Sequence, residues 1–380
     1  MPVLSNFRFL QIRPSLFLLF NILALISIGI VMIYSSSAFY AERNFGSPYY
    51  FITRQLLALA IGVVLLRIAI KFPYGNYKKL TPILMIVTLV FMLIVLIPGI
   101  GKQVGGARRW IRFLGIGFQP SEILKLTLII WVAGFLNRKK ELLGYFSRGL
   151  LPSFIVTGIF CFLLMLQPDF GTAMLICMTL LLMIFAAGGK TFHMVGSLAG
   201  VVSIGGFLIF SNVYRMRRMT GFLDPWADPL DSGFQLVQSF IAFGTGGIFG
   251  RNLGNSRQKL FFLPEGHTDF IFSILAEETG FIGTLLVMIL FSLLMLKGLE
   301  ISLHCPDDFG RNLAFGITSL IFLQTVFHIG VVIGLLPTKG IPLPFISYGG
   351  SSLVLCMFMV GILINISNAS HSAHPDARKS

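Results

Sequence analysis

Long apolar runs constrain the fold of this chain more than any other feature. One extends from Leu16 to Ile33, and similar runs recur through the rest of the sequence. A helix that spans the hydrocarbon core of a membrane needs roughly 20 apolar residues. Only 12% of the 380 residues are charged, whereas a soluble domain has about 25%. Because lipid cannot pair with backbone N–H and C=O groups, the runs predict an all-α, polytopic integral membrane bundle.

We predict ten transmembrane helices in one membrane domain that covers residues 1–380, with short cytoplasmic tails at 1–14 and 368–380. A cleaved signal peptide is the alternative for the first run. That run exceeds the ~7–15-residue apolar core of such peptides, which favours a retained span. The longest connection, between spans 7 and 8, is predicted to be a large extracytoplasmic loop. The predicted spans are 15–36, 50–70, 80–98, 120–136, 150–167, 172–188, 192–211, 269–296, 312–336 and 344–366.

Lysine and arginine orient the predicted bundle only weakly. With both termini in the cytoplasm, the inner connections hold 14 basic residues and the outer connections hold 12. The short connections 71–79 and 137–149 carry seven of the 14 and favour this orientation, because short basic loops remain in the cytoplasm. Eleven of the outer 12 lie in 99–119, 212–268 and 337–343. This outer excess predicts an anionic partner on that face; ordinary solvation of loops is the alternative.

A basic and aromatic stretch, GGARRWIRF, follows the third predicted span. Arg108, Arg109 and Arg112 surround Trp110. Tryptophan anchors at the level of lipid headgroups, and an arginine side chain can donate two hydrogen bonds to one phosphate. The stretch therefore predicts either a binding site for an anionic headgroup or a simple interfacial anchor.

Two acidic motifs, QPSEILK and QPDFGT, lie at predicted helix ends. In the first, Glu122 and Lys125 are three residues apart, so they share a helix face and can neutralise each other. Ionisable residues inside a span usually face the bundle interior or a wet cavity, so the two interpretations are a structural ion pair and the lining of a polar cavity. In the second motif, Asp169 is expected to cap a helix.

The long connection contains YRMRRMTGFLDPWADPLDSGFQ, in which apolar and basic residues alternate. Arg215 and Arg218 belong to its basic cluster. The pattern predicts short amphipathic helices folded onto the bundle at the membrane surface. Asp224, Asp228 and Asp231 have the spacing of turn residues, so structural caps are their expected role.

The stretch LPEGHTDF places several polar groups at the start of the eighth predicted span. Thr268 is a suitable N-cap, and Asp269 would then lie in the first helical turn, where the helix dipole favours an acid. The neighbouring His267 is not needed for capping. An acid at the mouth of a cavity near basic loops is a reasonable general base, and this is the role we predict for Asp269.

Two further acids follow within the same span. At 100° per residue, Glu277 lies about 80° from Asp269 on a helical wheel, and Glu278 lies roughly opposite. Only Glu277 is therefore expected to share a cavity with Asp269. Three acids on one span are too costly to have no role.

The stretch LLPTKGIPLPFISYGGSS interrupts the end of the predicted bundle with prolines and glycines. Irregular backbone at membrane depth is tolerated only where protein or water covers it. Lys339, Ser347 and Ser351 would line such a place. This stretch is predicted to be the second half of a site, with a plain loop as the alternative.

Taken together, these motifs resemble the SEDS family of bacterial cell-wall and sporulation proteins over nearly the whole chain. The matching stretches are GARRWI, QPSE with Lys125, QPDFGTA, YRMRR…FLDPWADP, LPEGHTDFIF…EETG and LPTKGIPLPFISYGGSS. FLDPWADP and the last stretch are closer to the division members of the family than to its elongation members. Two departures are visible: Gly266 stands where alanine is usual, and Asn252 where glycine is more typical.

The resemblance implies a peptidoglycan glycosyltransferase that polymerises lipid II on the outer face of the bacterial cytoplasmic membrane, with a class B penicillin-binding protein and other division proteins as membrane partners. The essential acid of the family falls on Asp269, and its intramembrane pair on Glu122 and Lys125. The expected substrate contacts are Arg108, Arg109, Glu122, Lys125, Arg215, Arg218, His267, Lys339, Ser347 and Ser351.

The expected location is the division septum. No organic cofactor and no nucleic-acid partner are expected, and a helping Mg²⁺ or Mn²⁺ ion has no clear ligand set in the sequence. The rival functions are a lipid II flippase, whose intramembrane charges and irregular helices would look the same, an elongation-type glycosyltransferase, and a non-catalytic scaffold.

Overall fold

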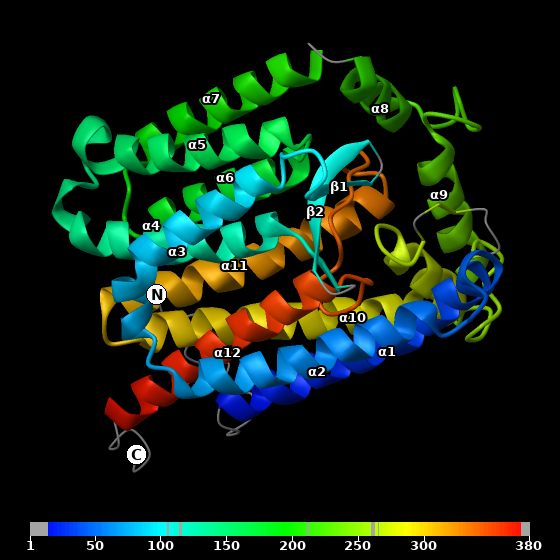
Figure 1. Ribbon diagram of the computed structural model, residues 1–380, viewed down its shortest axis with the longest axis horizontal. Helices are drawn as coiled ribbons and strands as arrows, with labels where there is room; N and C mark the ends of the chain where they lie inside the picture. The colour runs from blue at the N-terminus through cyan, green and yellow to red at the C-terminus, as the bar shows by residue number, and fades with distance from the viewer. Residues whose placement is uncertain are drawn as a thin grey trace.

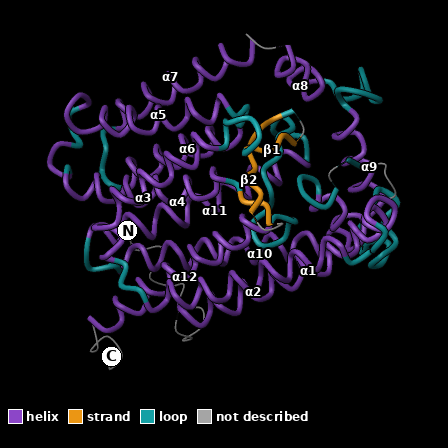
Figure 2. Tube along the Cα trace, viewed as in Figure 1, coloured by secondary structure: helices purple, strands orange, loops and turns teal. Residues whose placement is uncertain are grey.

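The computed structural model describes residues 14–373, except 105, 114–115, 211–212, 260–262 and 265. Eight of its helices are long and apolar enough to cross a membrane, and two shorter apolar helices accompany them. The long helices run side by side as one elongated bundle, and α8 and α9 lie toward one of its ends (Figures 1 and 2). The helices, with their bounds, are α1 (Pro14–Phe45), α2 (Tyr50–Lys71), α3 (Gly75–Ile94), α4 (Pro120–Arg138), α5 (Leu151–Leu166), α6 (Phe170–Ala186), α7 (Thr191–Phe210), α8 (Val213–Leu223), α9 (Phe234–Gly246), α10 (Ile271–His304), α11 (Asp308–Val332) and α12 (Gly350–Ala373).

The polytopic helical fold is thus confirmed, and a helix lies at each of the ten predicted spans. The number of membrane crossings stays a prediction, because eight of the described helices, and not ten, are both long and apolar enough to cross. The last predicted span was placed too early: 344–349 is not helical, and α12 begins at Gly350. Phe345 has a φ of +65°, in the left-handed region that a right-handed helix cannot include, so the helix starts only after it.

Helices α4 and α11 occupy the centre of the bundle. Most residues of both helices are buried, and each contacts the other. Around them, α2 packs on α12, α10 packs on α11, and α1 covers α10. The outer helices expose large apolar side chains such as Phe20, Phe162 and Leu303. An apolar outer surface is what a lipid-facing bundle requires, since lipid tails are as apolar as leucine.

A small antiparallel sheet, which was not predicted, forms from the basic stretch after α3. Its strands are β1 (Gly101–Val104), β2 (Ala107–Phe113) and β3 (Ile116–Phe118), in the order β1-β2-β3. Lys102 is opposite Trp110, and Arg112 is opposite Gly117. The tight turn before β2 contains Gly106 with a φ of +79°, a conformation that glycine adopts without steric cost.

The sheet, α8, α9 and the 333–349 segment lie toward one end of the bundle, whereas α12 ends toward the other (Figure 1). The three connections that carry the predicted outer basic excess are therefore grouped at one end.

Helix α10 is broken at Gly280, and the loop after α9 fills the break. Gly280 has φ 68° and ψ −165°. The carbonyl of Glu277, which would normally accept from Phe281, accepts instead from the Arg251 amide at 3.0 Å. The Phe281 amide donates to the Gly247 carbonyl at 2.9 Å. The loop thus supplies the hydrogen bonds that the broken helix lacks, as a membrane protein requires.

Replacing Gly280 with alanine is expected to destabilise the protein. The backbone conformation is nearly exclusive to glycine and costs other residues about 1–3 kcal/mol, and a Cβ there would overlap the backbone of Ile248 and Gly250. The measurement is the melting temperature in detergent, with Gly158→Ala as control because a Cβ at Gly158 meets no atom within 4 Å. Equal melting temperatures for the two variants would contradict this account of the break.

Candidate active site

Asp269 lies in the turn before α10 and not in its first helical turn. The helix begins at Ile271, and its N-cap, Phe270, makes no side-chain capping bond. The predicted N-cap role of Thr268 is therefore wrong. Asp269 is half-buried, and its carboxylate lies against Gly340: a Cβ built on Gly340 would be 2.6 Å from Asp269 Oδ2. The acid thus meets the stretch LLPTKGIPLPFISYGGSS directly. We call this stretch, residues 335–352, the proline-rich stretch.

Hydrogen bonds join the proline-rich stretch to the turn that carries the acid. Ser347 Oγ donates to the Thr268 carbonyl at 2.6 Å and accepts from the Leu343 amide at 2.8 Å. The Tyr348 amide donates to the His267 carbonyl at 3.0 Å. These two stretches, predicted to be two halves of one site, are therefore fixed to each other. The Ser347 hydroxyl holds the backbone in this arrangement.

His267 packs among aromatic rings next to the acid. Its ring centroid lies 4.5 Å from that of Phe51, 5.7 Å from Tyr40 and 5.8 Å from Tyr348. Rings at these distances make stabilising edge and offset contacts. The packing limits the rotation of the His267 side chain beside Asp269, so a contact of His267 with substrate stays a prediction.

Lys339, next to Gly340, contacts the QPDFGT motif, so this motif lies beside the site of Asp269. Its Nζ lies 3.3 Å from the centroid of the Phe170 ring, a cation–π arrangement, and its stem would contact a Cβ built on Gly171. Asp169 caps α6, as predicted, by accepting from the amide and the hydroxyl of Thr172. The start of α6 is therefore fixed where Lys339 passes over it.

Two of the predicted anion-binding arginines hold backbone carbonyls. Arg109 Nε donates to the Gln167 carbonyl at 3.0 Å, and a second nitrogen donates to the Pro168 carbonyl. Arg218 donates to the Thr338 carbonyl at 3.1 Å. These bonds tie the sheet to the start of α6, and α8 to the proline-rich stretch. The predicted role of both arginines was substrate binding, and this second role was not predicted.

The other predicted contacts are less constrained by the structure. Arg108 is half-buried in β2, next to the register shift that gives Arg109 no partner residue on β1. The side chain of Arg215 lies outside the described residues. Ser351, in the first turn of α12, has a buried hydroxyl that makes no hydrogen bond with any described residue. Contacts of these three residues with substrate stay predictions.

The aspartates of the long connection mostly stabilise turns, as predicted. Asp228 accepts from the amide and hydroxyl of Ser232, and these bonds lower the pKa of its carboxyl. Asp224 accepts from the Ala227 amide. Asp231 instead forms an ion pair with Arg217.

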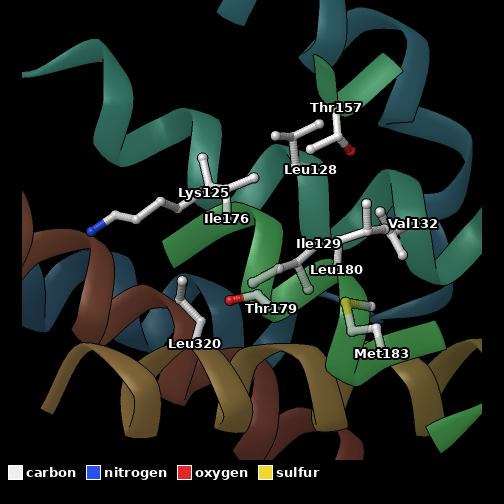
Figure 3. A pocket seen from close by; sticks show the side chains of 10 residues that line it. All are labelled: Lys125, Leu128, Ile129, Val132, Thr157, Ile176, Thr179, Leu180, Met183 and Leu320. Carbon is white, nitrogen blue, oxygen red and sulfur yellow. The ribbon is translucent and has the colours of Figure 1, made fainter. Parts of the chain in front are cut away.

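Glu122 and Lys125 form the predicted ion pair inside the bundle. Lys125 Nζ lies 2.8 Å from Glu122 Oε2, and both side chains are nearly fully buried. Lys125 also donates to Gln324 Oε1 at 3.1 Å. The cavity next to Lys125 measures about 10 Å³, room for about one water molecule. Its other lining residues are mostly apolar, and the Lys125 amine points away from them (Figure 3).

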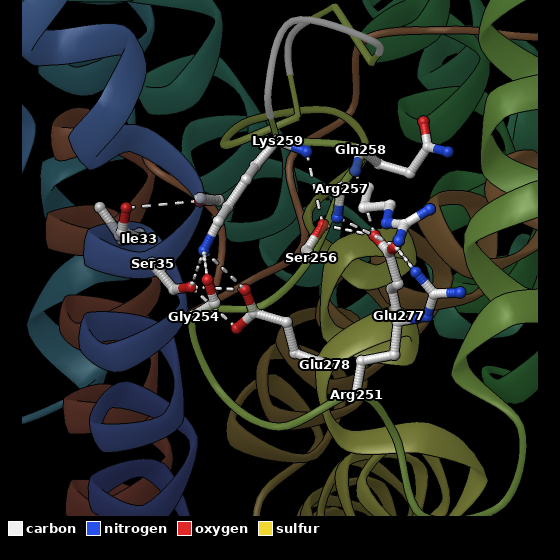
Figure 4. A network of polar contacts seen from close by, with 11 residues as sticks. Ile33, Ser35, Arg251, Gly254, Ser256, Arg257, Gln258, Lys259, Glu277 and Glu278 are labelled. Carbon is white, nitrogen blue, oxygen red and sulfur yellow. Dashed lines mark hydrogen bonds and ion pairs between the residues drawn. The ribbon is translucent and has the colours of Figure 1, made fainter.

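Glu277 and Glu278 hold the 251–259 segment against α10 (Figure 4). Glu277 accepts from the Ser256 hydroxyl and from the amides of Arg257 and Gln258, at 3.0 and 3.2 Å. Glu278 accepts from the hydroxyl of Ser35 in α1, at 2.6 Å, and forms an ion pair with Lys259 at 3.2 Å. Among the described residues, the Glu277 side chain bonds only to this segment, so its role is to fold the loop.

The two departures from the family pattern are accommodated. Asn252 has a φ of +74°, in the left-handed region that asparagine tolerates better than most residues, which explains why glycine is also suitable there. A Cβ at Gly266 would be 2.7 Å from the Ile274 side chain, so an alanine there requires that side chain to shift.

Comparison with known proteins decides the family. The model of the FtsW, RodA and SpoVE proteins, described as "Cell cycle protein", matches residues 16–372. The chain belongs to this family. The match confirms the SEDS resemblance and establishes an integral membrane protein of the bacterial inner membrane.

Individual family members match over nearly their full lengths. The chain is 44% identical to a probable peptidoglycan glycosyltransferase FtsW of Geobacter sp. (strain M18), over 91% of this chain and 94% of that protein. It is also 44% identical to the stage V sporulation protein E of Bacillus subtilis (strain 168), over 94% and 98%.

Solved structures of the family share the fold. A chain of a peptidoglycan synthase complex, described as coordinating polymerization and crosslinking, superposes with a TM-score of 0.76 at 28% identity and covers 93% of this chain and 97% of that chain. The rod shape determining protein RodA of Thermus thermophilus has a TM-score of 0.69 at 25% identity, covering 93% and 96%.

Several residues of the site were missed by sequence reasoning. Gly340 contacts the acid, and Gln324 and His328 of α11 reach the proline-rich stretch. The signal that could have indicated Gln324 and His328 is their polarity inside an apolar span, because a buried glutamine or histidine there must find a partner. The sequence gives no such signal for Gly340. Among the described residues, no group of three or more histidine, cysteine, aspartate or glutamate side chains could hold a metal ion.

Proposed function

We propose that this chain is a peptidoglycan glycosyltransferase of the FtsW type, which polymerises lipid II into glycan strands, with Asp269 as its general base. Relatives that carry the activity in their names are 41–44% identical over at least 90% of this chain. The structural observation that supports the site is the half-buried carboxylate of Asp269 at the junction of the two polar stretches.

The proposed reaction forms one bond and breaks one. Asp269 accepts the proton of a sugar hydroxyl while that oxygen attacks the anomeric carbon of the donor. The bond from this carbon to the lipid diphosphate breaks, and the diphosphate leaves with the electron pair. Because the negative charge on the leaving group increases in the transition state, preorganised cations accelerate the reaction. No acid is needed for a diphosphate leaving group.

Lys339 and Arg108 are the cations that we assign to the diphosphate. Lys339 adjoins Gly340, which touches Asp269, and Arg108 lies in the sheet at the same end of the bundle. Arg109 and Arg218 are assigned a supporting role, because their guanidinium groups already hold carbonyls. A divalent cation that accompanies the diphosphate remains compatible with this proposal, and no step depends on it.

We infer that this end of the bundle faces the outside of the cytoplasmic membrane and that both termini are cytoplasmic, so that Asp269 meets lipid II after its export. A class B penicillin-binding protein is the proposed partner, and the synthase complex that contains the structural relative supports this choice. The high identity to proteins named FtsW favours a septal role in division over an elongation role. Other division proteins are further proposed partners.

Purified protein with its transpeptidase partner and labelled lipid II in detergent tests the proposal. Long glycan products are expected, and they would separate an enzyme from a flippase, because detergent has no two sides between which to flip a lipid. A scaffold would also give no product. Absence of glycan under conditions where a control polymerase is active would overturn the proposal.

A further inference from the structure

Two buried polar side chains of α11 support the stretch that contacts Asp269. Gln324 and His328 are both 1% exposed and lie four residues apart, so they share one helix face. His328 Nδ1 donates to the Ile341 carbonyl at 2.8 Å, and Gln324 Nε2 donates to the Pro342 carbonyl at 2.9 Å. Two consecutive carbonyls are thus held from inside the bundle.

These carbonyls directly follow the residue that touches the acid. The Ile341 amide donates to the Lys339 carbonyl at 3.0 Å, which places Gly340 at the centre of a three-residue turn. This turn presents Gly340 to the Asp269 carboxylate. The positions of Ile341 and Pro342 therefore set the shape of the surface on which the carboxylate rests.

Gln324 also joins this turn to the buried ion pair. Its Oε1 accepts from Lys125 at 3.1 Å while its Nε2 donates to Pro342. A primary amide can accept at one atom and donate at the other, which neither a carboxylate nor an apolar side chain of this length can do. The polar chain runs from Glu122 through Lys125 and Gln324 to Pro342, two residues from Gly340.

We propose that Gln324 and His328 are positioning residues for Asp269, and that Glu122 and Lys125 act on catalysis through Gln324 and not by binding substrate. The inference rests on the proposed function. The pair is almost fully buried, and a cavity of about 10 Å³ beside it is too small for a diphosphate or a sugar, since such a space holds about one water molecule.

The first test compares two variants of His328 with a neighbouring control. His328→Phe keeps a ring but loses the donor, and it should lower kcat about 10- to 100-fold with KM nearly unchanged, because small misplacements of a catalytic group reduce rate at this scale. His328→Asn retains a donor near the position of Nδ1 and should restore most of kcat. Thr325→Val is the control, since Thr325 is buried but, among the described residues, its hydroxyl bonds only within its own helix, to the Ile321 carbonyl.

The second test is a double-mutant cycle between Lys125→Met and Gln324→Met. If the ion pair acts through Gln324, each variant lowers kcat, and the double variant is no slower than the slower single variant. If the losses of kcat in the two single variants multiply in the double variant, the proposal is overturned. The proposal is also overturned if His328→Phe has the kcat of wild type, or if His328→Asn is as slow as His328→Phe. If a variant of the cycle fails to fold, as shown by its melting temperature, the His328 pair decides.

Hydrogen exchange separates this inference from the proposed function. The Ile341 amide should exchange at least about tenfold faster in His328→Phe and Gln324→Met than in wild type. In Thr325→Val its exchange rate should equal that of wild type. Faster exchange together with no glycan from the wild-type protein would defeat the proposed function alone. Normal exchange together with an active wild type would defeat the positioning role.

Discussion

Replacing Asp269 with asparagine is expected to lower the rate of lipid II polymerisation by about 10²–10⁴-fold, the usual contribution of a general base. Asparagine has nearly the same shape as aspartate but cannot accept the hydroxyl proton at neutral pH. The half-buried turn that carries Asp269 is held by backbone contacts to Ser347 and Tyr348, so it should keep its structure. The KM for lipid II should change little.

The measurement is the initial rate of glycan formation by the purified complex with its transpeptidase partner. Asp231→Asn is the matched control, because Asp231 lies in the same connection and is half-exposed in an ion pair with Arg217. Melting temperatures of both variants must equal that of wild type. An Asp269→Asn enzyme that polymerises lipid II at the wild-type rate would remove Asp269 from the mechanism.

Replacing Gly340 with alanine should reduce kcat about 100-fold without touching an ionisable group, because an error of about 1 Å in a catalytic position can cost this much. The new Cβ would lie 2.6 Å from Asp269 Oδ2 and 3.3 Å from its Cγ. Since Gly340 is exposed and its φ is not positive, the added methyl group should displace the carboxylate and leave the fold intact.

Gly349→Ala provides the comparison for this variant. A Cβ at Gly349 would meet only the Ser352 Cβ, at 3.6 Å, which is an ordinary van der Waals contact. Both glycines belong to the same irregular stretch, so an equal loss of rate would mean that general loosening of the stretch, and not the contact with Asp269, limits the reaction. Equal rates in wild type and Gly340→Ala would show that the carboxylate has room to move.

Features set by local spacing were predictable from the sequence. The length of each apolar run was enough to predict a helical membrane bundle. The spacing of Glu122 and Lys125 predicted their ion pair, and the residues after Asp169 predicted its cap. The polar stretches around Asp269 and Lys339 indicated the site, because polar groups in so apolar a chain require a partner or a function.

Helix ends and loop structure were harder to predict. The Thr268 cap was wrong because cap preference competes with tertiary contacts, and here Ser347 holds the Thr268 carbonyl outside the helix. The sheet was missed because its strands are only three to seven residues long and lie in a segment that is too polar to span. The break at Gly280 depends on partners from the loop at 247–251.

The sequence by itself determined that this chain is a bundle of membrane helices with its chemistry in a few polar stretches, because apolar length and helical spacing are properties of neighbouring residues. Only the tertiary structure decided that Gly340 touches Asp269, that Arg109 and Arg218 hold carbonyls, and that Gln324 joins the buried ion pair to the site. These partners are far apart along the chain, and packing of the helices alone brings their hydrogen-bonding groups within reach.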